Sequence, residues 1–267
     1  MESLEASDQK PYPGLWQAVG ICGLYLLAVF VLVVPMIGVG MAFDVRLEEN
    51  PATMALVSLG ATIWVLGLYR NRTGIAQDTI SGPLGIPLRT IFPIAAVVIG
   101  LLMAEIPLLL WLINHFPVLD HVSDYGFEKS QVGAFVLLVL VAPLTEELLF
   151  RGVFLRGFVA RYGASRALLL SSTLFALAHF YPIKFLSTFA IGLLLGWLYL
   201  KFGTIWPGVM AHAMNNAVGF WAMTQGDPAK PFANTPADPQ LFLLVPAGAA
   251  LAAAGWWSLR RSVGTPQ

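Results

Sequence analysis

The hydrophobic positions of this chain form eight long continuous runs separated by short polar segments. A transmembrane helix needs about 20 apolar residues to cross a hydrocarbon core of about 30 Å, and each run is long enough or nearly so. The runs do not alternate apolar and polar residues as the strands of a membrane barrel do. The pattern predicts an all-α polytopic membrane protein with about eight transmembrane helices, near residues 16–42, 52–69, 91–113, 131–157, 167–182, 184–200, 204–223 and 240–258.

The composition agrees with this pattern. Of the 267 residues, 57% are hydrophobic and 11% are charged, whereas soluble domains carry about 25% charged residues. The polar stretches are too short to form a soluble domain, so we expect a single membrane domain over residues 1–267. It comprises N-terminal spans and an interfacial segment over 1–125, a core over 126–225, and a proline-rich outer loop with the last span over 226–267.

The basic residues are distributed unevenly between the predicted loops. With eight spans and both termini on one side, that side holds ten Lys and Arg residues and the other side four. By the positive-inside rule both termini are cytoplasmic. The ten are Lys10, Arg70, Arg72, Arg89, Arg156, Arg161, Arg166, Lys201, Arg260 and Arg261, and the four are Arg46, Lys129, Lys184 and Lys230. The formal net charge is zero, which gives no indication of a nucleic-acid partner.

Two adjacent carboxylates, Glu146 and Glu147, lie inside the fourth apolar run. A charged side chain at the centre of a bilayer costs about 2.5–3.5 kcal/mol on insertion scales, so the pair is expected to have a function. On a helix, Glu147 and Arg151 are one turn apart and can form an ion pair, while Glu146 is rotated by about 100° and left to face a cavity. Pro143 is expected to bend the helix nearby.

Two histidines lie in the following runs, whereas the first three runs and the last carry little chemistry. Counted from the predicted turn at Gly163, Glu146 and His179 lie 17 and 16 residues away, which places them at the same depth on antiparallel helices. His212 lies about ten residues after the turn at Gly203. It reaches that depth only if the hairpin of the fourth and fifth spans extends beyond the membrane.

The residue types in this core are those of a hydrolytic site. A carboxylate beside an imidazole can hold and deprotonate water, and a second imidazole with an amide can donate hydrogen bonds to an oxyanion. Glu146, His179 and His212 are also a ligand set for catalytic zinc, so a metal centre is the alternative. Glu105 lies in the third run and is expected either to line the same cavity or to form a structural pair.

Three motifs in this core resemble the CPBP family of intramembrane proteases, which includes Rce1-type CAAX prenyl endopeptidases and bacterial Abi proteins. The resemblance covers about residues 130–225, and it makes spans four to seven a CPBP-like catalytic core. The motifs are EExxxR at Glu146, Glu147 and Arg151, FxxxH at Phe175 and His179, and HxxxN at His212 and Asn216.

The resemblance implies a role for each of these residues. Glu146 would be the general base, assisted by His179, and His212 with Asn216 would form the oxyanion site. Glu147 and Arg151 would support the site or contact substrate. No cofactor is then required, although zinc bound by Glu146, His179 and His212 remains the alternative.

The expected function is hydrolysis of a peptide bond in a membrane-associated protein or peptide, in the cell membrane and most simply the inner membrane of a bacterium. The main alternative is a non-enzymatic immunity or scaffold protein of the Abi type. A proton-coupled transporter is disfavoured because no inverted repeat is visible. The sequence lacks the HExxH, GxGD and GxSxG motifs of other membrane and serine proteases. It selects no substrate, prenylated or not, and no oligomeric state.

Overall fold

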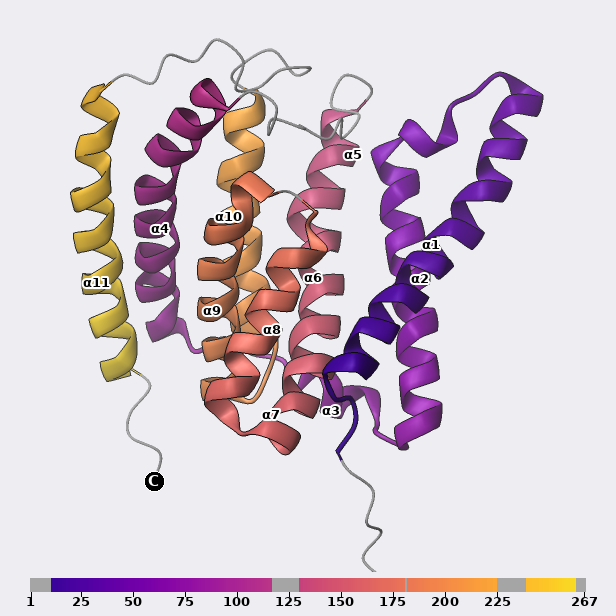
Figure 1. The fold of residues 1–267 in the computed structure, drawn as a ribbon, viewed down its shortest axis with the longest axis horizontal. Coiled ribbons are helices and arrows are strands. Elements are labelled where there is room, and N and C mark those ends of the chain that lie inside the picture. Colours follow the sequence, from indigo (N-terminus) through magenta and orange to yellow (C-terminus); the bar gives the residue numbers. More distant parts are fainter. Residues whose placement is uncertain (1–10, 117–129, 181, 225–238, 263–267) are drawn as a thin grey trace, which may run out of the picture.

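The structure, a computed structural model, describes residues 11–116, 130–180, 182–224 and 239–262. Within these ranges every regular element is a helix and no strand occurs, which confirms the predicted all-α class. Figure 1 shows most of the long helices standing side by side with roughly parallel axes.

One principal helix, in one case interrupted by π-helical segments, overlaps each of the eight predicted runs, with ends that differ by a few residues. The elements are α1 (Leu15–Phe43), η1 (Leu47–Glu49), α2 (Pro51–Thr73), α3 (Gln77–Ser81), α4 (Leu88–His115), α5 (Gln131–Phe135), η3 (Val136–Val141), α6 (Ala142–Glu147), η4 (Leu148–Leu155), α7 (Arg156–Tyr162), α8 (Ala164–Ala178), η5 (Pro182–Lys184), α9 (Phe185–Phe202), α10 (Trp206–Thr224), η6 (Pro239–Leu243) and α11 (Leu244–Ser262).

Six helical stretches of the described chain are long and apolar enough to cross a membrane. The chain is therefore a multi-pass membrane protein, while the number of eight crossings stays a prediction, because α8 has only 15 residues and α10 is not among the six. The six are Leu15–Phe43, Pro51–Thr73, Leu88–Leu112, Gln131–Tyr162, Pro182–Phe202 and Pro239–Ser262.

The fourth run differs from the simple helix that its apolar pattern predicts. Two π-helical segments, η3 and η4, flank the short α-helix α6, which carries both glutamates. The fifth run also ends earlier than residue 182, because α8 stops at Ala178 and His179 caps it. Pro182 follows closely and has no N–H with which to continue a helix.

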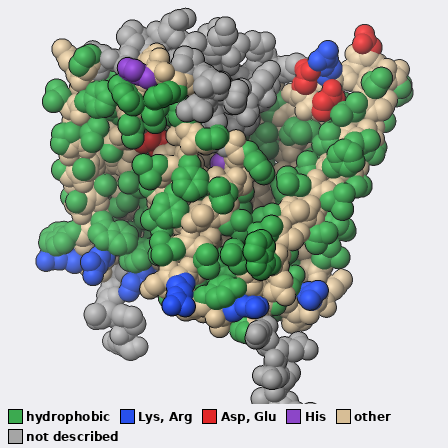
Figure 2. All heavy atoms as spheres, in the orientation of Figure 1, with side chains coloured by type: hydrophobic (Ala, Val, Ile, Leu, Met, Phe, Trp, Pro, Cys, Tyr) green, Lys and Arg blue, Asp and Glu red, His purple; other side chains and the backbone are tan. Residues whose placement is uncertain are grey.

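The described ends of the chain lie at the same edge of the bundle (Figure 1). Figure 2 shows Lys and Arg side chains gathered along that edge, whereas acidic residues of the α1–α2 connection lie at the opposite edge. This arrangement agrees with the charge asymmetry of the loops, and the cytoplasmic placement of the termini stays a prediction. Lys10, Lys129, Lys230 and the outer loop at 225–238 lie outside the described residues.

The interfacial segment before α4 connects two parts of the bundle. Thr204, in the turn between α9 and α10, donates from its hydroxyl to the Ser81 and Pro83 carbonyls at 3.0 and 2.8 Å. Ile80 is fully buried, and it packs directly over Gly152, where any added Cβ would meet its side chain at 2.6 Å. The segment therefore fixes the α9–α10 turn against the helix that carries the glutamates.

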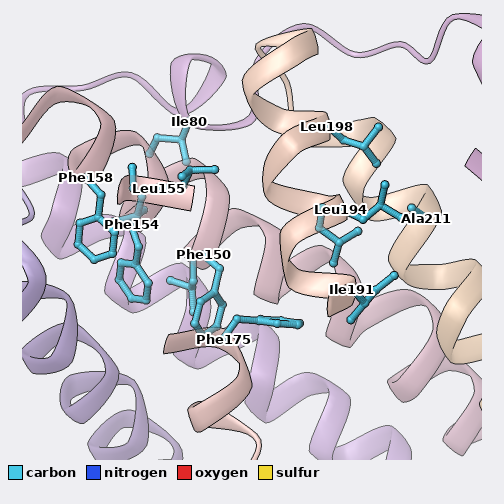
Figure 3. Packing of buried hydrophobic residues seen from close by; sticks show 14 of the residues in the cluster. Ile80, Phe150, Phe154, Leu155, Phe158, Phe175, Ile191, Leu194, Leu198 and Ala211 are labelled. Atoms are coloured by element: carbon cyan, nitrogen blue, oxygen red, sulfur yellow. The ribbon is translucent and has the colours of Figure 1, made fainter. Parts of the chain in front are cut away.

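Aromatic rings fill the centre of the bundle between η4 and α8. Phe150 lies between Phe154 and Phe175, with ring centroids 5.3 and 5.1 Å away and both pairs edge to face. Figure 3 shows Phe150 and Phe175 adjacent, with Ile191 beside Phe175. This packing joins η4, α8 and α9 into one hydrophobic core.

The last helix, α11, packs on α4 by direct backbone contact. A Cβ added to Gly100 would lie 2.5 Å from the Ala252 nitrogen and 2.6 Å from the Gly248 oxygen. Small residues allow such close approach between membrane helices, where van der Waals packing replaces the hydrophobic effect as the driving force. These glycines hold α11 on the bundle.

We expect Gly100→Ala to destabilise the protein by about 1–3 kcal/mol, because the new methyl group overpacks the α4–α11 contact. Gly67→Ala in α2 is the matched control, since nothing lies within 4 Å of a Cβ there, and it should be neutral or stabilise the helix by up to about 1 kcal/mol. Detergent-induced unfolding followed by circular dichroism measures both. Equal effects of the two substitutions would contradict this account of the packing.

Candidate active site

The two glutamates lie on a short α-helical segment between two stretches of π-helix. π-helical turns are rare and occur frequently at functional sites. In the η3 register the Leu138 carbonyl would accept from the N–H of residue 143, but that residue is Pro143 and has none. The Asn216 side-chain amide of α10 donates to this carbonyl instead, at 2.9 Å.

Glu147 and Arg151 form an ion pair that is sealed from solvent. Arg151 Nη1 donates to Glu147 Oε1 at 2.8 Å, and the Arg151 and Glu147 side chains are 1% and 0% exposed. Arg151 Nη2 donates to the Gly192 carbonyl of α9 at 3.1 Å. The guanidinium also lies over the Phe175 ring of α8, 4.5 Å from its centroid. The Arg151 side chain thus contacts two neighbouring helices, α8 and α9, besides Glu147 on its own helical run.

Glu147 also orients a histidine of α10. His212 is 3% exposed, and its Nδ1 lies 3.3 Å from Glu147 Oε1. The other oxygen, Glu147 Oε2, has no hydrogen-bond partner among the described residues. It faces Gly208, where a Cβ would approach within 2.8 Å. The glycine therefore leaves room for the carboxylate against α10.

Glu146 points to a different place from Glu147 and meets both histidines. Its Oε2 lies 3.9 Å from His179 Nε2 and 3.8 Å from His212 Nε2. Both distances exceed a direct hydrogen bond, and Oε2 has no hydrogen-bond partner within the described chain. A water molecule between these atoms can reach a carboxylate oxygen and an imidazole nitrogen at once.

The ring orientations define which nitrogen faces Glu146. His179 Nδ1 lies 2.8 Å from the Phe175 carbonyl, which only accepts, so Nδ1 carries the proton and the Nε2 lone pair faces Glu146. His212 Nδ1 likewise donates to the Glu147 carboxylate. The neutral forms therefore present two imidazole lone pairs and one carboxylate oxygen to a common space.

Asn216 lies one helical turn beyond His212 and has a structural contact of its own. Its Nδ2 donates to Leu138, as described above, while its Oδ1 accepts from Asn215 Nδ2 at 3.2 Å. These two bonds fix the orientation of the amide. The second amide hydrogen is not used by them.

Glu146, His179 and His212 lie at the same depth in the bundle, because Glu146 approaches both histidines within 4 Å. The sequence predicts this common depth. Glu146 lies 16 residues before the end of α7, whereas His212 lies six residues after the start of α10. At about 1.5 Å per α-helical residue, and less across the π-helical η4, the α7–α8 turn extends roughly 10–15 Å beyond the α9–α10 turn. The overhang of this hairpin is therefore present, while its position relative to a membrane stays a prediction.

Some contacts of the site carried no signal in the sequence. The carbonyls of Gly192 and Leu138 complete the contacts of Arg151 and Asn216, and backbone atoms are the same at every position. Glu105 interacts with Ser187 and Lys184 near the start of α9. This arrangement fits a structural pair better than a cavity residue.

The donor types around Glu146 fit zinc, but their spacing does not. Tetrahedral zinc with ligands at about 2.0–2.1 Å holds ligand atoms ~3.4 Å apart, whereas Glu146 Oε2 lies 3.8 and 3.9 Å from the two nitrogens. In the described part of the chain, no group of three His, Cys, Asp or Glu side chains is arranged to hold a metal ion.

Residues 128–218 match a protein-family model described as type II CAAX prenyl endopeptidase Rce1-like. The match includes all seven motif residues, from Glu146 to Asn216, and confirms the resemblance to this family. It supports a CAAX-type intramembrane endopeptidase in general. No curated protein matches the chain, and no solved structure matches it either.

We expect Arg151→Met to cost about 3–5 kcal/mol of stability, because it leaves the Glu147 charge buried without its partner. Arg46→Met removes the exposed partner of Glu49, from a pair whose side chains are 75% and 35% exposed, and should cost less than about 1 kcal/mol. Combining Arg151→Met with Glu147→Gln should restore much of the loss. Unfolding in detergent micelles compares the three variants, and equal costs for the two arginines would refute the importance of the buried pair.

Proposed function

We propose that this protein hydrolyses a peptide bond of a membrane-associated protein or peptide within the membrane. The observation that carries the proposal is the position of Glu146 Oε2, without a hydrogen-bond partner, between the Nε2 atoms of His179 and His212. The Glu146 side chain is 29% exposed, whereas its Oε2 atom is buried between the two histidines. The match to an endopeptidase family supports the reaction class.

In the proposed first step, Glu146 and His179 hold the attacking water. The water donates one hydrogen to Glu146 Oε2 and the other to the His179 Nε2 lone pair. Glu146 accepts a proton as the water oxygen attacks the carbonyl carbon of the substrate. When the tetrahedral intermediate collapses, protonated Glu146 returns the proton to the leaving amine nitrogen, and the C–N bond breaks.

His212 and Asn216 stabilise the oxyanion in this scheme. To donate from Nε2 while Nδ1 donates to Glu147, the His212 ring must carry both protons. The Glu147 carboxylate is the counter-ion for that form, and Arg151 holds it in place. The second amide hydrogen of Asn216 is the other donor. Such preorganised donors act where charge develops in the transition state.

The proposed mechanism uses no metal, since the wide spacing of the Glu146, His179 and His212 atoms suits a bridging water better than a zinc ion. The proposed location is the cell membrane, and the proposed partner is the membrane-embedded substrate. The substrate carries the scissile bond to the depth of Glu146.

Neutralising the general base should abolish cleavage. We expect Glu146→Gln to lower turnover by about 10²–10⁴-fold, the usual contribution of a general base, while the protein still inserts normally. Mass spectrometry of new protein termini in cell membranes should detect cleavage products with the wild type that are absent with Glu146→Gln. Asp78→Asn removes an exposed carboxylate of α3 and should leave the products unchanged. A wild-type protein that creates no new termini would instead support an immunity or scaffold function.

Metal removal should leave activity intact. We expect purified protein, dialysed against a chelator until metal analysis detects less than one zinc per ten chains, to retain its turnover of a peptide spanning a mapped cleavage site. The reason is that the proposed water activation depends on Glu146 and His179 alone. Activity that disappears with the metal and returns with added zinc would assign these residues to a metal centre.

A further inference from the structure

Three hydroxyl side chains face one another between α1 and α2, in spans that the sequence pattern marked as poor in chemistry. Tyr25 Oη and Ser58 Oγ lie 2.9 Å apart and form a hydrogen bond. Thr62, one turn beyond Ser58 on α2, is 2% exposed. It lies close to the Tyr25 phenol, but its Oγ1 makes no hydrogen bond of acceptable geometry within the described chain.

The first two helices are in register at their basic end. The Tyr12 and Tyr69 rings stack there, with centroids 5.9 Å apart. Tyr25 lies 13 residues after Tyr12, and Ser58 lies 11 residues before Tyr69. Tyr12 precedes α1, so the helical rise applies to Ser58 alone, which lies roughly 15–20 Å further into the bundle at about 1.5 Å per residue. The hydrogen bond between Tyr25 and Ser58 places Tyr25 beside it.

Counting residues along the helices also gives the depth of Glu146 relative to these hydroxyl groups. Arg156 lies near Tyr69, close enough for its charge to act on that phenol, and Glu146 lies ten residues before Arg156. Glu146 and Ser58 are therefore at the same depth. α2 packs against α6, which carries Glu146. The hydroxyl side chains thus adjoin the proposed site.

We propose that Tyr25, Ser58 and Thr62 bind the main chain of the substrate next to the scissile bond. This inference rests on the proposed peptidase function and names a binding element for it. A peptide must be extended to be cleaved, and within lipid its N–H and C=O groups then need other partners. Hydroxyl groups both donate and accept hydrogen bonds, so they serve an extended main chain of any sequence.

A purely structural role explains only part of this arrangement. Hydroxyl groups do join membrane helices, and the Tyr25–Ser58 bond alone fits that purpose. Thr62 does not, because its hydroxyl is buried and still unpaired. A threonine in a helix usually bonds to a carbonyl one turn earlier, as Thr145 does to Val141 at 2.9 Å. The Thr62 hydroxyl therefore retains hydrogen-bonding capacity, although it is buried in this structure.

The test measures steady-state cleavage by the full chain in lipid vesicles. Its probe is an internally quenched peptide that spans a cleavage site mapped in the termini comparison. We expect Tyr25→Phe and Thr62→Val each to raise KM about five- to tenfold, the loss of one hydrogen bond, with kcat within twofold. A second probe carries an ester in place of the amide beside the scissile bond. The wild type should bind the ester probe more weakly than the amide probe, whereas one of the two variants should bind both probes equally.

Tyr69→Phe is the matched control, because it removes a buried tyrosine hydroxyl on α2 that has no hydrogen-bond partner in the described residues. Its KM should equal that of the wild type. If the wild type cleaves the probe and neither variant changes KM, the main-chain site is refuted and the peptidase function stands. If Tyr25→Phe only lowers the unfolding temperature, the hydroxyl side chains are structural. If the wild type does not cleave the probe, both proposals fail.

Discussion

The buried ion pair of Glu147 and Arg151 is the interaction on which the rest of the site depends. Two charges removed from water are stable only if their geometry is good and their remaining hydrogen-bonding groups are largely satisfied. Arg151 meets this requirement with Glu147, the Gly192 carbonyl and the Phe175 ring. Glu147 holds His212. The contacts therefore join the helices that also supply the residues of the proposed reaction.

The irregular backbone around α6 is likewise stabilised by hydrogen bonds to backbone carbonyls that have lost their helical partners. Within lipid, a carbonyl that loses its helical partner must find another. Asn216 supplies a donor for Leu138 opposite Pro143, and Ser171 donates to the Phe150 carbonyl of the second π-helical segment at 3.0 Å. Polar side chains of α8 and α10 thus stabilise the helix that presents Glu146, which gives Asn216 a structural role beside its proposed catalytic one.

The flanking helices are attached to this core in two different ways. α11 is held along its length by glycine contacts with α4. α1 exposes most of its apolar side chains and is anchored near its start, where the Leu15 N–H donates to Tyr162 Oη at 3.1 Å. Further along α1, Tyr25 adds a polar contact to Ser58 of α2 near the depth of Glu146. The flanking pair α1–α2 is therefore linked to the chemistry of the core as well as to the lipid.

The sequence by itself determined the all-α membrane class, the positions of the principal helices, the i,i+4 pairing of Glu147 with Arg151 and the common depth of Glu146 and His179. These features follow from local periodicity and helical rise. Only the tertiary structure decided the π-helical segments, the end of α8 at His179, the carbonyl partners of Arg151 and Asn216, and the contact of Tyr25 with Ser58. They depend on which backbone groups lack partners and which helices touch, and neither property is encoded in the spacing of residue types along one span.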